Sequence, residues 1–273
     1  MLSWKEFANQ FSHSARDLVD VEALKQSGVV IFGGGAVGSR MVELLCRSFV
    51  GRLTLWDFDT VAVSNLCRSV YDARNLGLSK AQAAATLCGN INPLVKVTAV
   101  EGDLLKAPEI VVAKIAIAHG AAVVAADDFR VHRRVNRILY PVTDCVFPYV
   151  TNSGDAGEVV WTSPGERGCL ECLTNAEERA AAGVAGDFQA LGTDVLRVAL
   201  EATCVVLGIL LRGKKGGDLY GDYVNRSSHL LLVLSRMRGP VAGALPGDVV
   251  SGTVHVDTSG SRQGCSVCDT RQR

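Results

Sequence analysis

The sequence lacks an excess of charge of either sign. Its 273 residues include 28 basic and 28 acidic side chains, so no broad positive field exists to hold nucleic acid or an anionic membrane non-specifically. Long apolar runs are also missing, because the longest, such as Cys204 to Leu211, are too short to span a bilayer. Residues Met1 to Phe7 show no signal-peptide pattern. We therefore expect a cytoplasmic protein with no membrane or nucleic-acid partner.

The composition is otherwise that of a globular protein. Apolar residues make up 48% of the chain, which is enough to bury a sizeable core in one large domain or two modest ones. From Val29 onward, short apolar segments alternate with helical patterns, as is typical of an α/β protein with a parallel sheet. The predicted strands are 29–32, 53–57, 95–100, 121–126 and 145–150, and the predicted helices are about 37–50, 79–90, 109–118 and 130–138.

The pattern changes on either side of this alternation. Residues 1–27 place apolar side chains at near-helical intervals, which predicts an N-terminal helical arm. The segment Glu158–Trp161 predicts an edge strand, and a long helix is predicted from about Phe188 to Leu211. Residues 218–256 carry short apolar segments with tyrosines and arginines. We expect them to form either an ordinary helix with surface loops or a surface that selects the substrate.

A glycine-rich stretch follows the first predicted strand. Gly33, Gly35 and Gly38 have G-x-G-x-x-G spacing, in which the first glycine permits a tight turn and the second lets phosphate oxygens approach the backbone. The third lets helix and strand pack closely. A nucleotide phosphate would then lie on the free N–H groups at the helix start near Ala36. The motif alone is weak evidence, because a nicotinamide dehydrogenase would share it.

The residues after the second predicted strand separate these possibilities. Asp57 lies where a dinucleotide-binding fold places the acid that binds ribose, but it opens the polar run DFDTVAVSNLCR, which a hydride-transfer enzyme has no reason to contain. This run resembles the D-x-D-x-V-x-x-S-N-L-x-R signature of the MoeB, ThiF and HesA family, the bacterial relatives of ubiquitin-activating enzymes. Lys80, the Ile91–Pro93 helix end and the acid after Ala126 follow in the family's order. The resemblance covers residues 20–212 and the last cysteine pair.

The resemblance implies a Rossmann-like, doubly wound, mostly parallel sheet and an enzyme that adenylates a carboxylate. Family members bind ATP with Mg²⁺ and transfer AMP to the C-terminal carboxylate of a small protein or peptide, releasing pyrophosphate. The displacement requires positioning and cationic stabilisation of phosphate oxygens, and no general base, because the attacking carboxylate is already ionised. The implied roles are ATP binding by Asp57 and Asp59, the former at the ribose, phosphate contacts by Asn65, Arg68 and Lys80, and Mg²⁺ binding by Asp127.

Several of these residues also have an ordinary structural interpretation. Asp57 and Asp59 could be solvated acids at a strand end, and Ser64 and Asn65 could belong to a turn or a helix cap. Lys80 could be an exposed lysine that opens a helix. Their agreement in order and spacing favours the adenylation site over these separate interpretations.

The acid that would bind the metal is one of two neighbours. Asp127 is followed by Asp128, and counting back from Asn136, which resembles the family's asparagine, favours Asp127. His132 falls where the family often has an arginine, and we expect it to be a surface histidine rather than a catalytic one.

Two Cys-x-x-Cys pairs form the second strong pattern. Four thiolates in two such pairs make a tetrahedral structural zinc site that is closed to substrate. One pair alone could be a redox motif, and four unrelated cysteines remain the alternative. The second pair lies near the end of the sequence, so Zn²⁺ would pin an antiparallel C-terminal extension to the core, an arrangement that the family shares. The four residues are Cys169, Cys172, Cys265 and Cys268.

The remaining cysteines bear on whether a covalent intermediate forms. Cys46, Cys88 and Cys204 lie in apolar helical patterns, which favours core packing. Cys67 lies beside the predicted phosphate contacts, where a cationic neighbour could lower the pKa of its thiol. Family members that form a thioester or persulfide keep a cysteine in the loop crossing the active site, and the matching stretch 175–192 contains none. We therefore expect an enzyme that stops at the acyl adenylate.

Two classes of function follow from this pattern. The first is an ATP-dependent adenylyltransferase, expected to be a homodimer, for a ubiquitin-like or sulfur-carrier protein or a precursor peptide ending in Gly-Gly. The second is a non-catalytic docking subunit of an activating-enzyme-like complex. Its support is that the family's N-terminal arginine, which reaches the partner subunit's γ-phosphate, is replaced near Asn9, with Arg16 the nearest arginine.

The same pattern predicts how the chain is divided. Residues 1–27 form the helical arm, and residues 28–165 form the ATP-binding Rossmann-like core. Residues 166–273 contribute the crossover loop, the long helix and the zinc-bound C-terminal part to the same domain.

Overall fold

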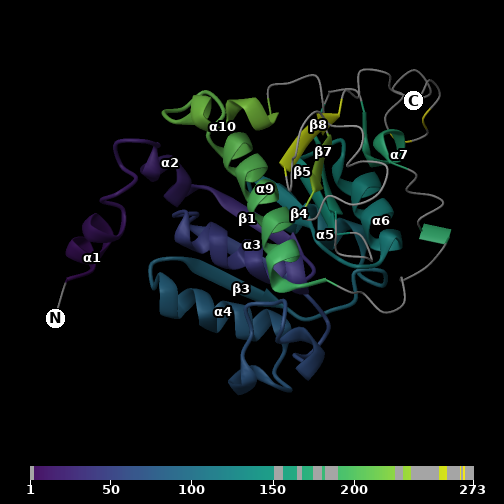
Figure 1. Ribbon diagram of the computed structural model, residues 1–273, viewed down its shortest axis with the longest axis horizontal. Helices are drawn as coiled ribbons and strands as arrows, with labels where there is room; N and C mark the ends of the chain where they lie inside the picture. Colours follow the sequence, from purple (N-terminus) through teal and green to yellow (C-terminus); the bar gives the residue numbers. More distant parts are fainter. Residues whose placement is uncertain are drawn as a thin grey trace.

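An eight-stranded sheet organises the chain (Figure 1). The computed structural model describes residues 3–150, 156–164, 168–174, 180, 181, 190–224, 265 and 267, together with the backbone of 230–234 and 252–256. The strand order is β3-β2-β1-β4-β5-β6-β7-β8. The strands are β1 Gly28–Phe32, β2 Arg52–Trp56, β3 Lys96–Val100, β4 Ala121–Val124, β5 Cys145–Val150, β6 Ala156–Thr162, β7 Leu230–Leu234 and β8 Gly252–Val256.

The sheet has a parallel part and an antiparallel part. From β3 through β5, each strand pairs in parallel with its neighbour. From β5 through β8, every pairing is antiparallel. The predicted α/β class, with a mostly parallel doubly wound core and an antiparallel extension, is confirmed.

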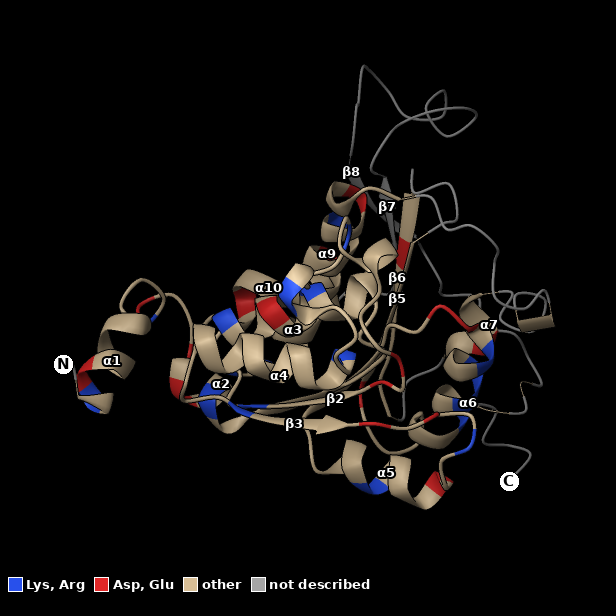
Figure 2. Ribbon diagram, turned by 90° about the horizontal axis from the view of Figure 1, so that it is seen from below, with Lys and Arg blue, Asp and Glu red and all other residues tan. Residues whose placement is uncertain are grey.

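Helices cover both faces of the sheet (Figure 2). Alternate residues of β1 point to opposite faces, so Val29 and Ile31 pack in one core and Val30 and Phe32 in the other. Because both faces are covered, every residue of β1 and β4 is buried, which explains their continuous apolar sequences. One face carries α3 Ala36–Arg47, α4 Lys80–Ile91, α9 Gly192–Leu210 and α10 Gly217–Val224, and the other carries α5 Glu109–Ile117, α6 Phe129–Leu139 and α7 Leu170–Leu173.

Two short helices precede the sheet. Helix α1, Trp4–Phe11, begins with a capping box between Ser3 and Glu6, and α2 spans Val21–Gln26. None of the α1 residues is buried, and the helix projects from the body of the molecule in both ribbon views (Figures 1 and 2). Among the described helices, none has both the length and the apolar composition needed to cross a bilayer.

The prediction of an edge strand at 158–161 is wrong. Strand β6 pairs with β5 on one side and with β7 on the other, so it lies inside the sheet. Its burial agrees with this position, since Val160 and Trp161 are both buried. The missing neighbour was β7, which comes from the segment 218–256. That segment contributes α10, β7 and β8 rather than only a helix and loops.

Candidate functional site

A cavity of about 430 Å³ opens at the carboxyl ends of the parallel strands. It lies where the strand order reverses, because β1 is followed by β2 on one side and neighbours β4 on the other. In doubly wound folds, ligands bind at this switch point. Every predicted nucleotide-site residue except Gly38 lines the cavity, namely Gly33, Gly35, Asp57, Asp59, Asn65, Arg68, Lys80 and Asp127.

The three glycines of the G-x-G-x-x-G motif have different local surroundings, and Gly38 lies in the first turn of α3. Gly33 has a φ of +101°, a left-handed conformation that favours glycine. A Cβ atom on Gly38 would lie 1.8 Å from the carbonyl oxygen of Gly33, so the close approach of the two backbone segments leaves no room for a side chain at this position. A Cβ atom on Gly35 would meet no atom within 4 Å. The start of α3 therefore faces open space, as a phosphate-binding helix N-terminus requires.

Asp57 joins this loop to the segment after β2. It is buried, and its Oδ2 accepts a hydrogen bond of 2.5 Å from the Gly34 N–H. Its Oδ1 accepts another of 2.7 Å from the Asp59 N–H. Burial raises the pKa of Asp57 above its ordinary value, while these hydrogen bonds and the nearby Lys80 act in the opposite direction. Asp57 is thus not a solvated strand-end acid, because it also shapes the loop.

Lys80 is the first residue of α4, and its side chain is only 9% exposed. Its amino group donates a hydrogen bond of 2.7 Å to Oδ2 of Asp59, whose side chain is 48% exposed. The alternative of an exposed helix-opening lysine is therefore wrong. A buried ammonium ion requires a charged or polar partner, and Asp59 provides one at the wall of the cavity.

Tyr71 is a structural contributor to the site that the sequence did not reveal. Its buried hydroxyl lies 2.8 Å from the carbonyl oxygen of Gly34 and 3.2 Å from that of Lys80. Burial raises the pKa of Tyr71, so the hydroxyl stays protonated and can donate. It therefore connects the glycine loop to the first turn of α4.

Asn65 and Arg68 come from the short polar segment after β2. Asn65 ends the 3₁₀ turn Val63–Asn65, and its Oδ1 accepts a hydrogen bond of 2.9 Å from the Ala62 N–H. Asn65 thus has the predicted capping contact and also lines the cavity, so the two interpretations are compatible. Arg68 lines the same cavity.

The structure separates the two neighbouring acids at the start of α6. Asp128 is the N-cap of the helix and accepts a hydrogen bond of 2.8 Å from the Arg130 N–H. The Arg130 guanidinium lies 2.6 Å from Asp128 Oδ2. Burial opposes ionisation of Asp128, but the hydrogen bonds from Arg130 hold its pKa below the ordinary value. Both acids line the cavity, but Asp127 is exposed there, whereas Asp128 is buried at the cap of the helix.

The prediction of a surface position for His132 is wrong. The side chain is 1% exposed and stacks on Phe129, with ring centroids 4.8 Å apart. Its Nε2 donates to the Ala126 carbonyl oxygen at 2.7 Å. Phe129, His132, Asn136 and Leu139 are all buried, at helical spacings that form one face. His132 therefore holds the backbone immediately before Asp127.

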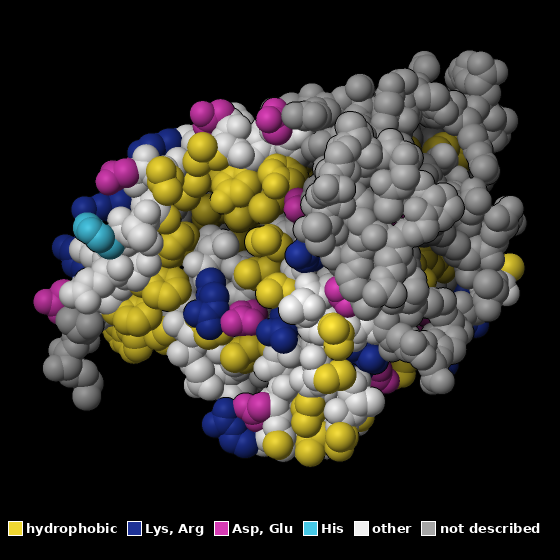
Figure 3. Space-filling view, in the orientation of Figure 1, with side chains coloured by type: hydrophobic (Ala, Val, Ile, Leu, Met, Phe, Trp, Pro, Cys, Tyr) yellow, Lys and Arg dark blue, Asp and Glu magenta, His cyan; other side chains and the backbone are white. Residues whose placement is uncertain are grey.

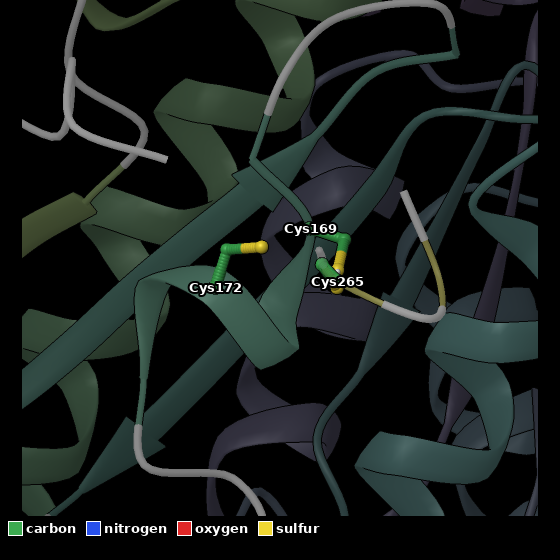
Figure 4. A group of neighbouring side chains, drawn as sticks. All are labelled: Cys169, Cys172 and Cys265. Carbon is green, nitrogen blue, oxygen red and sulfur yellow. Dashed lines mark hydrogen bonds between the residues drawn. The ribbon is translucent and has the colours of Figure 1, made fainter. Parts of the chain in front are cut away.

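Three of the four predicted zinc ligands lie together (Figure 4). The sulfur atoms of Cys169, Cys172 and Cys265 all lie within 4.8 Å of one another, and those of Cys169 and Cys265 are 3.7 Å apart. Thiolates about 2.3 Å from a tetrahedral zinc ion are separated by about 3.8 Å, so the spacing fits. Cys268 lies outside the described residues.

A zinc ion held by this cluster would pin the C-terminal segment, so its removal is expected to loosen that segment. Val267 is buried against Cys169 and Tyr140, and metal binding is coupled to this local folding. For Cys172→Ser, we expect loss of bound zinc, faster proteolysis near residue 265 and reduced but measurable catalysis. Cys67→Ser, at an exposed cysteine outside the cluster, should change neither zinc content nor proteolysis. Full zinc content in Cys172→Ser would contradict the site.

The other described cysteines differ in burial. Cys46, Cys88 and Cys145 are buried, which confirms the predicted core packing of Cys46 and Cys88, whereas Cys204 is only half-buried against α10. Burial raises the pKa of the Cys145 and Cys204 thiols, which disfavours the reactive thiolate. Cys67 is exposed, and its thiol lies 3.7 Å from the Ser64 carbonyl oxygen. The predicted crossover stretch 175–192 lies mostly outside the described residues.

The structure is a doubly wound α/β fold with a glycine-rich loop and a buried lysine at its switch-point cavity. The chain belongs to the ThiF family, whose family model matches residues 7–238. This finding confirms the predicted family.

Relatives and solved structures agree with this membership. The chain is 29% identical to ubiquitin-like modifier-activating enzyme 5 of Bombyx mori over 160 residues, which are 55% of this chain and 41% of the relative. It is 28% identical to molybdopterin-synthase adenylyltransferase of Salmonella typhimurium over 159 residues, which are 58% of this chain and 63% of the relative. The chain thus spans less than two thirds of the length of either protein.

The fold is similar to that of two solved E. coli proteins. Superposition on MccB with ATP gives a TM-score of 0.69 at 18% identity and covers 98% of this chain and 82% of that chain. The tRNA N6-threonylcarbamoyladenosine dehydratase TcdA gives 0.61 at 18% identity and covers 78% and 98%. These likenesses extend the shared architecture beyond the segments matched in sequence.

Proposed function

We propose that this chain is an ATP-dependent adenylyltransferase that activates the C-terminal carboxylate of a ubiquitin-like or sulfur-carrier protein, or of a peptide, as an acyl adenylate. One observation carries the proposal. The glycine loop, a buried lysine, an arginine, an asparagine and an exposed aspartate come from separate segments of the chain and line one cavity. The family membership and a relative named as an adenylyltransferase support it. In this proposal, residues 28–165 form the ATP-binding core.

The side chains in the cavity suit displacement at phosphorus. A carboxylate oxygen of the substrate attacks the α-phosphorus atom, the new O–P bond forms, and the bond to the bridging oxygen breaks so that pyrophosphate leaves with the electron pair. Lys80 and Arg68 would stabilise the charge on the phosphate oxygens, and Asn65 would donate to them through its amide nitrogen. The substrate carboxylate is ionised near neutral pH, so the site needs no general base.

Asp127 is the residue that we propose as the Mg²⁺ ligand. Bound Mg²⁺ would neutralise charge on the phosphates, and a carboxylate is its preferred protein ligand. For Asp127→Asn, we expect about a tenfold or greater increase in the Mg²⁺ concentration that gives half-maximal activity. Asp128→Asn keeps a residue that caps helices well, so its Mg²⁺ requirement should stay near that of the wild type. Equal requirements in the two variants would contradict this assignment.

Asp57 is expected to make nucleotide affinity sensitive to acid. Its pKa is raised from 3.8, so the folded protein binds this proton more tightly than the unfolded chain does. The cost of burying the Asp57 charge is therefore present above the folded pKa and relieved as pH falls through it. Protonation also removes an acceptor for the Gly34 or Asp59 N–H. We therefore expect ATP affinity to fall in the same window.

Calorimetric titration with ATP at a series of pH values from neutral down toward 3.8 would measure the loss of ATP affinity as Asp57 is protonated. Asp57→Asn, which carries no titrating carboxyl group, should have weaker affinity without that acid limb. An identical acid limb in the variant and in the wild type would assign the titration to another group.

We propose that the reaction ends at the acyl adenylate. The Cys145 thiol is buried and the Cys204 thiol is half-buried, and both have raised pKa values. The stretch 175–192 contains no cysteine. The adenylate would pass to another protein or to a small nucleophile. A carrier covalently attached to Cys67, Cys145 or Cys204, trapped and identified by mass spectrometry, would contradict this endpoint.

The expected partners are a small carrier protein or peptide ending in Gly-Gly and a second copy of this chain. Hydrophobic side chains gather over α9 and α10 on one face of the molecule (Figure 3). Leu196, Leu200 and Leu219 are 42%, 49% and 54% exposed there. We propose that a homodimer buries part of this face.

ATP–pyrophosphate exchange is the experiment that tests the proposed function. Exchange should appear when a carrier ending in Gly-Gly is added with Mg²⁺ and should be absent when the carrier's last glycine is removed. ATP binding without exchange for any carrier would instead support the docking-subunit alternative.

A further inference from the structure

Helix α6 reaches from the cavity to the cysteine cluster. Its first turn contributes Arg130 and Val131 to the cavity wall, directly after Asp127 and Asp128. From Arg133 onward, the helix contacts α7, the short helix that carries Cys172. With 11 residues, the helix is about 16 Å long. A rigid element of this length can carry a displacement from one site to the other.

One face of α6 makes the contacts with α7. The Arg133 Nε donates to Glu171 Oε1 at 2.7 Å, and the Leu170 N–H donates to Asn136 Oδ1 at 3.3 Å. Tyr140, the residue after the helix, packs with Cys169. Positions 133, 136 and 140 are one turn apart or nearly so, which places them on the same side of the helix.

The contact between Arg133 and Glu171 is an ion pair. The side chains of Arg133 and Glu171 are 22% and 13% exposed, and Arg137 approaches the same carboxylate at 3.8 Å. A charge-assisted hydrogen bond that is largely shielded from water is stronger than an exposed ion pair. Breaking it would leave a guanidinium group unpaired in a poorly solvated place, which is costly.

Glu171 is flanked by two residues of the cysteine cluster. It lies between Cys169 and Cys172, so a metal ion on these thiolates would fix the backbone on both sides of it. On the cavity side, the His132 Nε2 donates to the Ala126 carbonyl oxygen. Position 132 adjoins Arg133, so the backbone that carries Asp127 is connected to α6 one residue from the Glu171 contact.

We propose that Glu171 is a positioning residue that sets the Asp127 carboxylate through Arg133 and α6, an inference that rests on the proposed function for the role of Asp127. In this proposal, a metal ion on the cysteine cluster would hold the C-terminal segment and would also fix the position of Glu171. It provides a fixed support against which the metal-binding wall of the cavity is aligned.

The test is Glu171→Gln in the full chain loaded with zinc. We expect an increase of about fivefold or more in the Mg²⁺ concentration needed for half-maximal ATP binding, with unchanged zinc content and unchanged binding of ATP in the absence of Mg²⁺. Amide hydrogen exchange should become faster in the first turn of α6. These readouts distinguish positioning from a general loss of stability, because the latter would also weaken metal-free ATP binding.

Glu43→Gln is the matched control. Glu43 also faces two arginines, Arg47 at 3.0 Å and Arg40 at 3.8 Å, but all three residues belong to α3. The control removes a similar charge from within one helix, so the Mg²⁺ requirement should not change. The double variant Glu171→Gln with Arg133→Gln should show no larger increase than the stronger single variant, because the two residues act as one contact.

The possible outcomes separate this proposal from the proposed function. An unchanged Mg²⁺ requirement or unchanged exchange in the first turn of α6 of Glu171→Gln would overturn the positioning role. Failure of the wild type itself to bind ATP with Mg²⁺ would overturn the proposed function and, with it, the role assigned to Asp127.

Discussion

Replacing Gly35 with leucine is expected to abolish ATP–pyrophosphate exchange while leaving the protein folded. The backbone at Gly35 has a φ of −70° and a ψ of −150°, which residues other than glycine can adopt, and no atom lies within 4 Å of a Cβ placed there. The new side chain would extend into the space where we place the phosphates. Exchange should fall by at least about 100-fold, since small misplacements of the reacting groups have effects of this size.

Gly38→Ala is the control that separates loss of the site from loss of the fold. Its Cβ would lie 1.8 Å from the Gly33 carbonyl oxygen, so the backbone must shift and the melting temperature should fall. Circular dichroism should show a wild-type melting temperature for Gly35→Leu and a lower one for Gly38→Ala. Normal exchange by folded Gly35→Leu would show that the phosphates bind elsewhere.

Lys80→Met is expected to reduce the rate of adenylate formation by about 100- to 1000-fold, the usual effect of removing one group that stabilises transition-state charge. Methionine keeps much of the length of the buried side chain and removes its charge. The loss of Lys80 also removes a cation that lowers the pKa of Asp57, so the acid limb of ATP binding should move to higher pH. Single-turnover kinetics would measure the rate.

Lys106 offers the matched control for Lys80. Both lysines pair with an aspartate that lines the cavity, Lys80 with Asp59 at 2.7 Å and Lys106 with Asp103 at 3.0 Å. The Lys106 side chain is 84% exposed, however, and it is not among the cavity residues. Lys106→Met should change the rate by no more than about twofold, because exposed ion pairs contribute little. Equal losses in both variants would contradict a specific catalytic task for Lys80.

The parallel core could be predicted from the sequence because local pattern and tertiary position agree there. Continuous apolar segments such as Ala121–Val124 are buried on both faces, and the glycine spacing after Phe32 predicts the loop that the structure contains. The antiparallel extension was harder to predict. Whether β6 lies at an edge depends on its pairing with Leu230–Leu234, about seventy residues away in the sequence, and a single strand's sequence does not encode that partner.

The residues of the site also divide into those that the sequence indicated and those that only the structure revealed. Asp57, Lys80 and Asp127 stand in a recognisable order, so the sequence indicated them as candidates. The burial of His132 and the hydrogen bonds of Tyr71 depend on packing between helices and loops, which the order of residues alone does not reveal. The sequence already favoured Asp127 over Asp128, and the structure adds that Asp128 caps α6.

The Tyr71 hydroxyl between the carbonyl groups of Gly34 and Lys80 has a thermodynamic consequence. It connects the loop that would receive the phosphates to the helix that begins with Lys80. The conformational entropy lost in ordering these two elements is then lost on folding and not on binding. Nucleotide association should accordingly carry a small entropic penalty.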